Sequence, residues 1–121
     1  MVQKIQKTNP LLIDLINQLK KEALENKKPL WKDVALRLEK SSKNWPVVTL
    51  KRIDEHVNEK ETALVPGKVL STGKLNKKIS IAAWNFSGKA QQKINDAGGK
   101  TMTIEELLKK NPEGKNIRIV G

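Results

Sequence analysis

The chain has 121 residues, a length typical of one domain, and carries 24 Lys and Arg against 13 Asp and Glu, for a formal net charge of +11. This charge favours a polyanionic partner. The absence of cysteine excludes disulfides, thiolate zinc sites and cysteine nucleophiles, and no stretch reaches the roughly 18 apolar residues of a membrane span. We therefore predict one domain over residues 1–121, with residues 1–8 as a flexible extension, in a reducing cytoplasm.

Helical periodicity dominates the first third of the chain. Asn9 is a suitable N-cap and Pro10 suits the first helical position, and the apolar residues that follow predict a helix ending near Asn26. A shorter helix is predicted after Pro29. Its apolar face consists of Trp31, Val34, Ala35 and Leu38.

The middle of the chain changes from helical to strand patterns. Residues 41–46 have the composition of an exposed loop, and residues 47–50 predict a short strand that enters a helical turn near Ile53 and Val57. Three further strands are expected over residues 63–65, 69–70 and 79–84. Pro66-Gly67 and residues 71–78 are the expected connections between them.

The last third of the chain contains clear helix signals. Ser87 can cap a helix that runs through Ile94 and stops at Gly98, where the Gly98-Gly99 pair permits a left-handed conformation. Thr103 and Glu106 form a capping box for a helix over residues 104–110. Residues 117–120 predict a closing strand, so the chain as a whole is predicted to be α/β.

Residues that could support catalysis are few. His56 is the only histidine and has no cysteine or second histidine as a metal partner, so we expect it to be exposed or to contact phosphate. Glu105 and Glu106 lie in a first helical turn, where the dipole favours carboxylates. Ala97-Gly98-Gly99-Lys100 lacks the spacing of a phosphate loop. We therefore predict no enzyme, no metal, no cofactor and no small-molecule substrate.

The distribution of charge is the strongest functional signal. No acidic residue occurs between Glu61 and Asp96, although several lysines do, and the stretch from Lys40 to Ile53 is also free of acids. Such single-sign segments indicate contact with backbone phosphates, and the scarcity of arginine favours shape recognition over base reading. The predicted phosphate contacts are Lys43, Lys51, Arg52, Lys68, Lys74, Lys77, Lys78, Lys89 and Arg118.

The three tryptophans are predicted to have different roles. Trp31 and Trp84 have apolar neighbours, which favours packing in the core. Trp45 follows Asn44 and precedes Pro46 in a polar, basic segment. It is equally compatible with stacking on an unpaired base and with a lid over the core.

A series of residues also resembles a known family signature. The series is Lys68-Val69-Leu70, Gly73, Leu75, Ile79, Ile81, Ser87, Ala90, Ile94 and Gly98. Its order and spacing are similar to those of the eighteen-e family of archaeal and eukaryotic large-subunit ribosomal proteins and its bacterial counterpart, ribosomal protein fifteen. Flanking motifs resemble the archaeal branch: Thr8-Asn9-Pro10, Leu30-Trp31-Lys32-Asp33, Val65-Pro66-Gly67, Ala97-Gly98-Gly99-Lys100, Asn111-Pro112 and Ile117-Arg118-Ile119.

This resemblance, which runs from about Thr8 to Gly121, carries its own expectations. It implies N-terminal helices followed by an irregular superhelix of β-β-α turns in a single compact domain. It also implies a structural constituent of the large ribosomal subunit in the cytoplasm, with large-subunit ribosomal RNA and neighbouring ribosomal proteins as partners.

The chain departs from the family pattern in two places. Residues 41–46 replace an arginine-rich loop, and Lys77 stands where many members have histidine.

Two alternative functions are considered beside the ribosomal one. They are a general nucleic-acid-binding, chromatin-like protein and a small RNA-modifying or RNA-cleaving enzyme.

Overall fold

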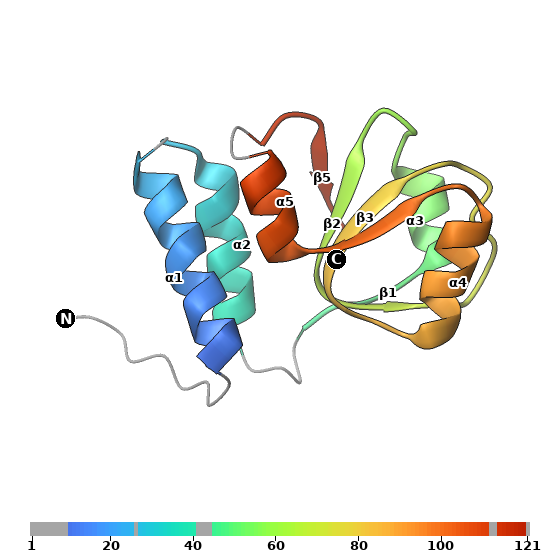
Figure 1. Cartoon of the computed structure of the whole chain (residues 1–121), viewed down its shortest axis with the longest axis horizontal. Helices are drawn as coiled ribbons and strands as arrows, with labels where there is room; N and C mark the ends of the chain where they lie inside the picture. The colour runs from blue at the N-terminus through green and yellow to red at the C-terminus, as the bar shows by residue number, and fades with distance from the viewer. Residues whose placement is uncertain (1–9, 26, 41–44, 112–113, 121) are drawn as a thin grey trace.

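A parallel sheet separates two groups of helices (Figure 1) in the computed structural model, which describes residues 10–25, 27–40, 45–111 and 114–120. Helices α1, α2 and α5 cover one face of the sheet and α3 and α4 cover the other. The elements are α1 (Pro10–Glu25), α2 (Pro29–Glu39), β1 (Val47–Thr49), α3 (Leu50–His56), β2 (Thr62–Leu70), β3 (Ser80–Phe86), α4 (Gly88–Asp96), β4 (Lys100–Thr103), α5 (Ile104–Lys110) and β5 (Ile117–Ile119).

The first two helices lie where the sequence predicts them, and they pack as an antiparallel hairpin (Figure 1). Helix α1 buries Leu12, Leu15, Ile16 and Leu19, and α2 buries Trp31, Val34, Ala35 and Leu38 against the same core. Lys27, with φ of 52°, is in the left-handed region between the two helices. The predicted N-cap Asn9 and the predicted extension over residues 1–8 lie outside the described residues.

Alternation along the central strands divides the core in two. Ala63, Val65, Ile81 and Ala83 face α3 and α4, whereas Leu64 and Ala82 face α1, α2 and α5. Side chains of successive strand residues point to opposite faces, so a sheet covered on both sides needs apolar residues at every position. This explains the unbroken apolar runs at residues 63–66 of β2 and 81–84 of β3.

All strand pairs are parallel, and β2 lies at the centre of the sheet. The order is β1-β2-β3-β4, and β5 pairs with the first part of β2 while β1 pairs with its last part. Each pair of successive strands is therefore joined by a connection that runs back to the start of the next strand. These four connections contain α3, a helix-free crossover at residues 71–79, α4 and α5, in that order. The backbone coils as a superhelix, and the predicted α/β class is confirmed.

Pro66-Gly67 was predicted as a connection, and this prediction is wrong. Both residues lie inside β2, where the register with β3 shifts between Val65 and Lys68. Pro66 lies between the segment of β2 that pairs with β5 and the segment that pairs with β1. The N–H that proline lacks is therefore not needed for a hydrogen bond to either strand. A Cβ atom at Gly67 would overlap the Pro46 carbonyl oxygen, which accepts the Lys68 N–H at 3.1 Å. The dipeptide makes a bulge.

Strand β4 was not predicted, whereas the surrounding helix boundaries are confirmed. The Ser87 hydroxyl accepts the Ala90 N–H at 3.2 Å, and Gly98 adopts a φ of 83° after α4. At α5, the Thr103 hydroxyl accepts the Glu106 N–H at 3.0 Å. The return bond of the predicted capping box, from the Thr103 N–H to the Glu106 carboxylate, is not formed between these two described residues.

Candidate nucleic-acid interface

Several predicted cations gather where the parallel strands end. Strands β1 and β3 end at Thr49 and Phe86, so the residues that follow them emerge at the same edge of the sheet. Lys51 and Arg52 occupy the first turn of α3, where the Thr49 hydroxyl accepts the Arg52 N–H at 3.3 Å. Lys89 occupies the first turn of α4. This carboxyl edge therefore carries exposed cations from two separate parts of the sequence.

The crossover at residues 71–79 adds a further cation, Lys74, from a third part of the sequence. The Lys51 N–H donates to the Thr72 carbonyl oxygen at 3.1 Å, and a Cβ atom at Gly73 would clash with Lys51. Lys93 of α4 donates to the carbonyl oxygens of Ser71 at 2.8 Å and Gly73 at 3.2 Å. These contacts anchor the crossover to α3 and α4 and hold the exposed Lys74 beside Lys51.

Lys68 projects from the bulged half of β2. Its Cα lies opposite Val47 on one side and Asn85 on the other, and its side chain is exposed. The acid-free run between Glu61 and Asp96 thus supplies cations from β2, the crossover and α4.

Lys77 has a different environment from its neighbours. Its half-buried ammonium donates to the carbonyl oxygens of Asp54 at 2.7 Å and Val57 at 3.2 Å, at the C-terminal end of α3. The adjacent Asn76 N–H donates to the Asp54 carboxylate at 2.9 Å. Lys77 therefore closes the end of a helix, where the backbone carries partial negative charge.

Lys78 and Arg118 lie at the opposite end of the sheet from Lys51. The exposed Lys78 side chain covers Gly98, while the Arg118 Nε donates to the Glu61 carboxylate at 3.1 Å. The pKa of Glu61 is lowered by the hydrogen bond from the Asn58 backbone N–H and, secondarily, by Arg118. Arg118 thus has a carboxylate partner within the protein, unlike those of the other predicted cations that the structure describes.

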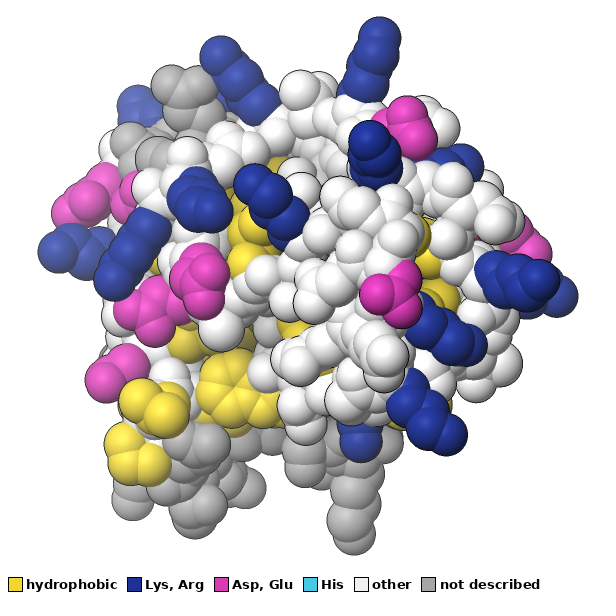
Figure 2. Space-filling view, turned by 45° about the vertical axis from the view of Figure 1, so that its right-hand side comes forward, with side chains coloured by type: hydrophobic (Ala, Val, Ile, Leu, Met, Phe, Trp, Pro, Cys, Tyr) yellow, Lys and Arg dark blue, Asp and Glu magenta, His cyan; other side chains and the backbone are white. Residues whose placement is uncertain are grey.

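The predicted set is therefore only partly assembled into one surface. Lys43 lies outside the described residues. The cations that are exposed and form no ion pair within the described ranges are Lys51, Arg52, Lys68, Lys74, Lys78 and Lys89. Figure 2 shows Lys and Arg side chains projecting around the periphery of one view, with acidic side chains between them at a few places.

Ion pairs are concentrated in the other helical layer. Within α1, α2 and α5, the pairs are Lys20–Glu39, Lys21–Glu25, Arg37–Asp33 and Lys109–Glu105. The layer formed by α3, α4 and the crossover has exposed lysines without such partners in the described part of the chain. The protein therefore has one helical layer in which lysines are partly neutralised and one in which they are not.

The tryptophans pack as part of the fold. Trp31 is fully buried, which confirms the core prediction, and Trp84 is half-buried against the same cluster. Trp45 meets Trp84 edge-on with ring centroids 6.1 Å apart, and its indole N–H donates to the Lys40 carbonyl oxygen at 3.0 Å. Of the two alternatives for Trp45, these contacts favour the lid over the core.

His56 is the exposed last residue of α3. In the part of the chain that the structure describes, no group of three or more His, Asp or Glu side chains could hold a metal ion. None of the helices in these same ranges combines the length and the apolar character required to cross a membrane.

Sequence reasoning missed Lys93 as an anchor and Lys77 as a helix cap. Their carbonyl partners lie 20 or more residues away along the chain, so no local pattern marks either role. The one hint in the sequence was Gly73, because a glycine among lysines allows the crossover backbone to lie close to another segment.

Comparison with known proteins identifies related chains over nearly the whole length. A family model described as "Ribosomal protein 60S L18 and 50S L18e" matches residues 3–120. "Large ribosomal subunit protein eL18" of Methanothermobacter thermautotrophicus is 45% identical over 120 residues, which cover 99% of both chains. The proteins of the same name from Methanoregula boonei and Archaeoglobus fulgidus are 46% and 43% identical, over 99% and 96% of this chain and 99% of each relative.

Proposed function

The chain belongs to the family of ribosomal protein 60S L18 and 50S L18e, and from this membership we propose that it is a structural constituent of the large ribosomal subunit in the cytoplasm. In this role it binds large-subunit ribosomal RNA and contacts neighbouring ribosomal proteins. Its function is to hold RNA segments in their tertiary arrangement, and it performs no chemical reaction.

One observation carries the RNA-binding part of the proposal. Lys51, Lys74 and Lys89 are exposed on the layer of α3, the crossover and α4, and none has a carboxylate partner within the described ranges. A lysine ammonium is a compact point charge, which suits contact with phosphate oxygens more than bidentate reading of base edges. This layer is therefore the surface for the RNA backbone.

The backbone beneath these lysines is fixed before RNA binds. The Lys51 N–H is bonded to Thr72, and Lys93 bonds two carbonyl oxygens of the crossover next to Lys74. Lys89 follows the Ser87 cap of α4, where the helix dipole adds a favourable potential for phosphate. Because the supporting backbone is ordered, little conformational entropy is lost on binding.

The test is the salt dependence of binding to purified large-subunit ribosomal RNA. In the triple variant K51A/K74A/K89A, the slope of log affinity against log salt should be lower by roughly 2, since each lost phosphate contact contributes about 0.7 to 0.9. The matched control is K20A/K21A/K109A, which loses the same charge from lysines already paired with carboxylates. Equal slopes in the two variants would contradict the proposed surface.

Competition with duplex DNA separates this function from general nucleic-acid binding. At equal salt, the ribosomal RNA should displace the protein from duplex DNA at lower concentration than DNA displaces it from RNA, because the lysine surface is matched to an irregular fold of RNA. Equal competition would favour the chromatin-like alternative.

A further inference from the structure

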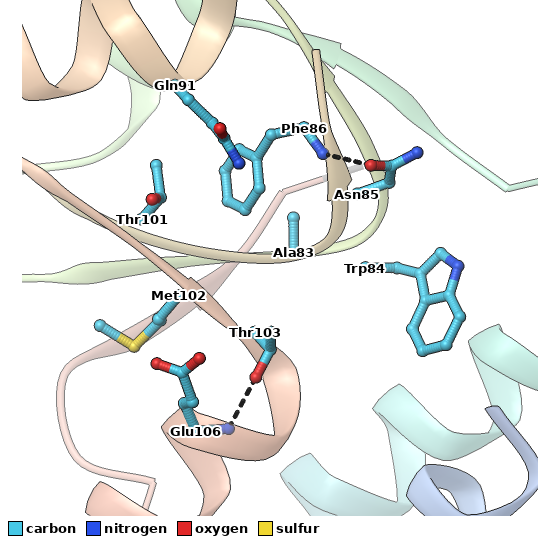
Figure 3. Close-up of a pocket in the computed structure, with 9 residues that line it drawn as sticks. All are labelled: Ala83, Trp84, Asn85, Phe86, Gln91, Thr101, Met102, Thr103 and Glu106. Carbon is cyan, nitrogen blue, oxygen red and sulfur yellow. Dashed lines mark hydrogen bonds between the residues drawn. The ribbon is translucent and has the colours of Figure 1, made fainter. Parts of the chain in front are cut away.

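A cavity of about 250 Å³ opens between α4, α5 and the ends of β3 and β4. Figure 3 shows Gln91 entering from α4 and Glu106 from α5, with Phe86, Thr101 and Met102 along the walls. The volume is below the roughly 300 to 1,000 Å³ of pockets for drug-sized molecules, so the cavity suits a smaller group.

The polar groups of this cavity have unused hydrogen-bonding capacity. Within the described ranges, the side chains of Gln91, Thr101 and Glu106 make no hydrogen bond or ion pair. The neighbouring Glu105 forms an ion pair with Lys109 at 3.3 Å. The Glu106 carboxylate, in contrast, does not accept the Thr103 N–H, which is the second bond of a capping box. This carboxylate is left available at the cavity.

The remaining walls suit an aromatic ring. Phe86 and Met102 are half-buried, and both line the cavity. An aromatic ring offers a stacking surface, and a thioether is polarizable and packs well against rings. The exposed Lys89 follows Phe86 by three residues at the start of α4, which places a cation for phosphate close to the aromatic wall.

We propose that this cavity binds one unpaired nucleobase of the RNA and that it prefers guanine; the inference rests on the proposed RNA-binding function. An ionised carboxylate only accepts hydrogen bonds, and guanine presents two adjacent donors, N1–H and the N2 amine. The other three bases place an acceptor beside each donor on that edge, so one carboxylate oxygen would face an acceptor. Glu106 is thus the specificity residue, and Gln91 and Thr101 supply further polar contacts.

The experiment uses the full chain and short oligouridines that contain one central G, A, C or inosine, with affinity measured by fluorescence anisotropy. Wild type should bind the G oligomer about tenfold more tightly than the A oligomer, the discrimination typical of a bidentate contact. Inosine, which lacks the N2 amine, should fall between them. The amide signals of Gln91 and Glu106 should shift in NMR spectra on adding the G oligomer.

The variant E106Q keeps the shape of the side chain but replaces one acceptor with a donor, so it should lose the preference for G. The matched control is E105Q on the same helix, outside the cavity, which should retain the preference. Equal affinity for all four oligomers, or a preference for G retained in E106Q, would overturn the inference. The proposed function is judged separately, because the salt slope with ribosomal RNA depends on lysines and E106Q removes none.

Discussion

Lys77 was predicted to contact phosphate, but its ammonium group is hydrogen-bonded within the protein. Its ammonium lies between the carbonyl oxygens of Asp54 and Val57, at 2.7 and 3.2 Å, and satisfies acceptors that the helix cannot pair internally. The charge is therefore committed to the end of α3. This geometry argues that Lys77 contributes to stability more than to RNA contact.

The variant K77A should lower the free energy of unfolding by roughly 1.5 to 3 kcal/mol, the range for hydrogen bonds to charged groups. The control K74A removes an exposed lysine that makes no bond in the described ranges, and its effect should stay within about 0.5 kcal/mol. Urea unfolding followed by circular dichroism gives both values. If the two variants proved equally stable, Lys77 would not act as a cap.

For single residues, sequence patterns predict contacts between residues that are close together in the chain. Ser87 and Thr103 were predicted as caps from their residue type and position, and each hydroxyl accepts the N–H of the residue three positions later. Arg118 was predicted to contact phosphate, but its partner Glu61 lies 57 residues away. No pattern in the sequence joins two residues at that separation, since only the pairing of β5 with β2 brings them together.

Among the elements, β2 and β4 show how the sheet overrides local signals. Pro66-Gly67 is a strong turn signal, yet β2 continues through it because β3 pairs on both sides of the bulge. Strand β4 has the sequence Lys-Thr-Met-Thr and lies at an edge of the sheet, without fully buried residues. A strand that buries so little lacks the apolar pattern by which the other strands were recognised.

Gly99 determines how closely the connection after α4 approaches β3. A Cβ atom there would overlap the Ile79 carbonyl oxygen, which accepts the Lys100 N–H at 3.3 Å. The variant G99A should therefore push β4 away from β3 and lower the free energy of unfolding by about 1 to 3 kcal/mol.

The matched control for this prediction is G88A. Gly88 is the first residue of α4, and nothing lies within 4 Å of a Cβ atom added there. Since alanine restricts the unfolded chain, G88A should be neutral or stabilising by up to about 1 kcal/mol. Thermal unfolding of both variants tests the pair. A G99A variant as stable as wild type would show that β4 tolerates a shift from β3.

For the whole molecule, the net charge was evident from composition, but its distribution between layers was not. Lys20, Lys21 and Lys109 of α1 and α5 pair with carboxylates on their own or neighbouring helices, whereas the lysines of α3, the crossover and α4 have no such partner within the described ranges. The cavity beside α4 was also beyond sequence analysis, because Gln91 and Glu106 belong to different helices. A surface for phosphates and a recess for a base both require the tertiary arrangement.

The formal charge of +11 should destabilise the isolated protein through self-repulsion, which salt screens. The Debye length falls from about 30 Å at 0.01 M to about 8 Å at 0.15 M, so the thermal midpoint of the free protein should rise over this range. The affinity for RNA should fall over the same range. Repulsion and RNA binding arise from the same lysines, and salt therefore changes stability and affinity in opposite directions.

Calorimetry of three proteins without RNA can separate net repulsion from local ion pairs. K51A/K74A/K89A lowers the charge at lysines without partners, so its midpoint should exceed that of wild type at low salt and rise less as salt increases. K20A/K21A/K109A lowers the charge equally but leaves Glu39, Glu25 and Glu105 without their lysines. Its thermal midpoint at low salt should therefore rise less than that of K51A/K74A/K89A. A wild-type midpoint that falls with salt would mean that attraction within the ion pairs exceeds the repulsion among the unpaired lysines.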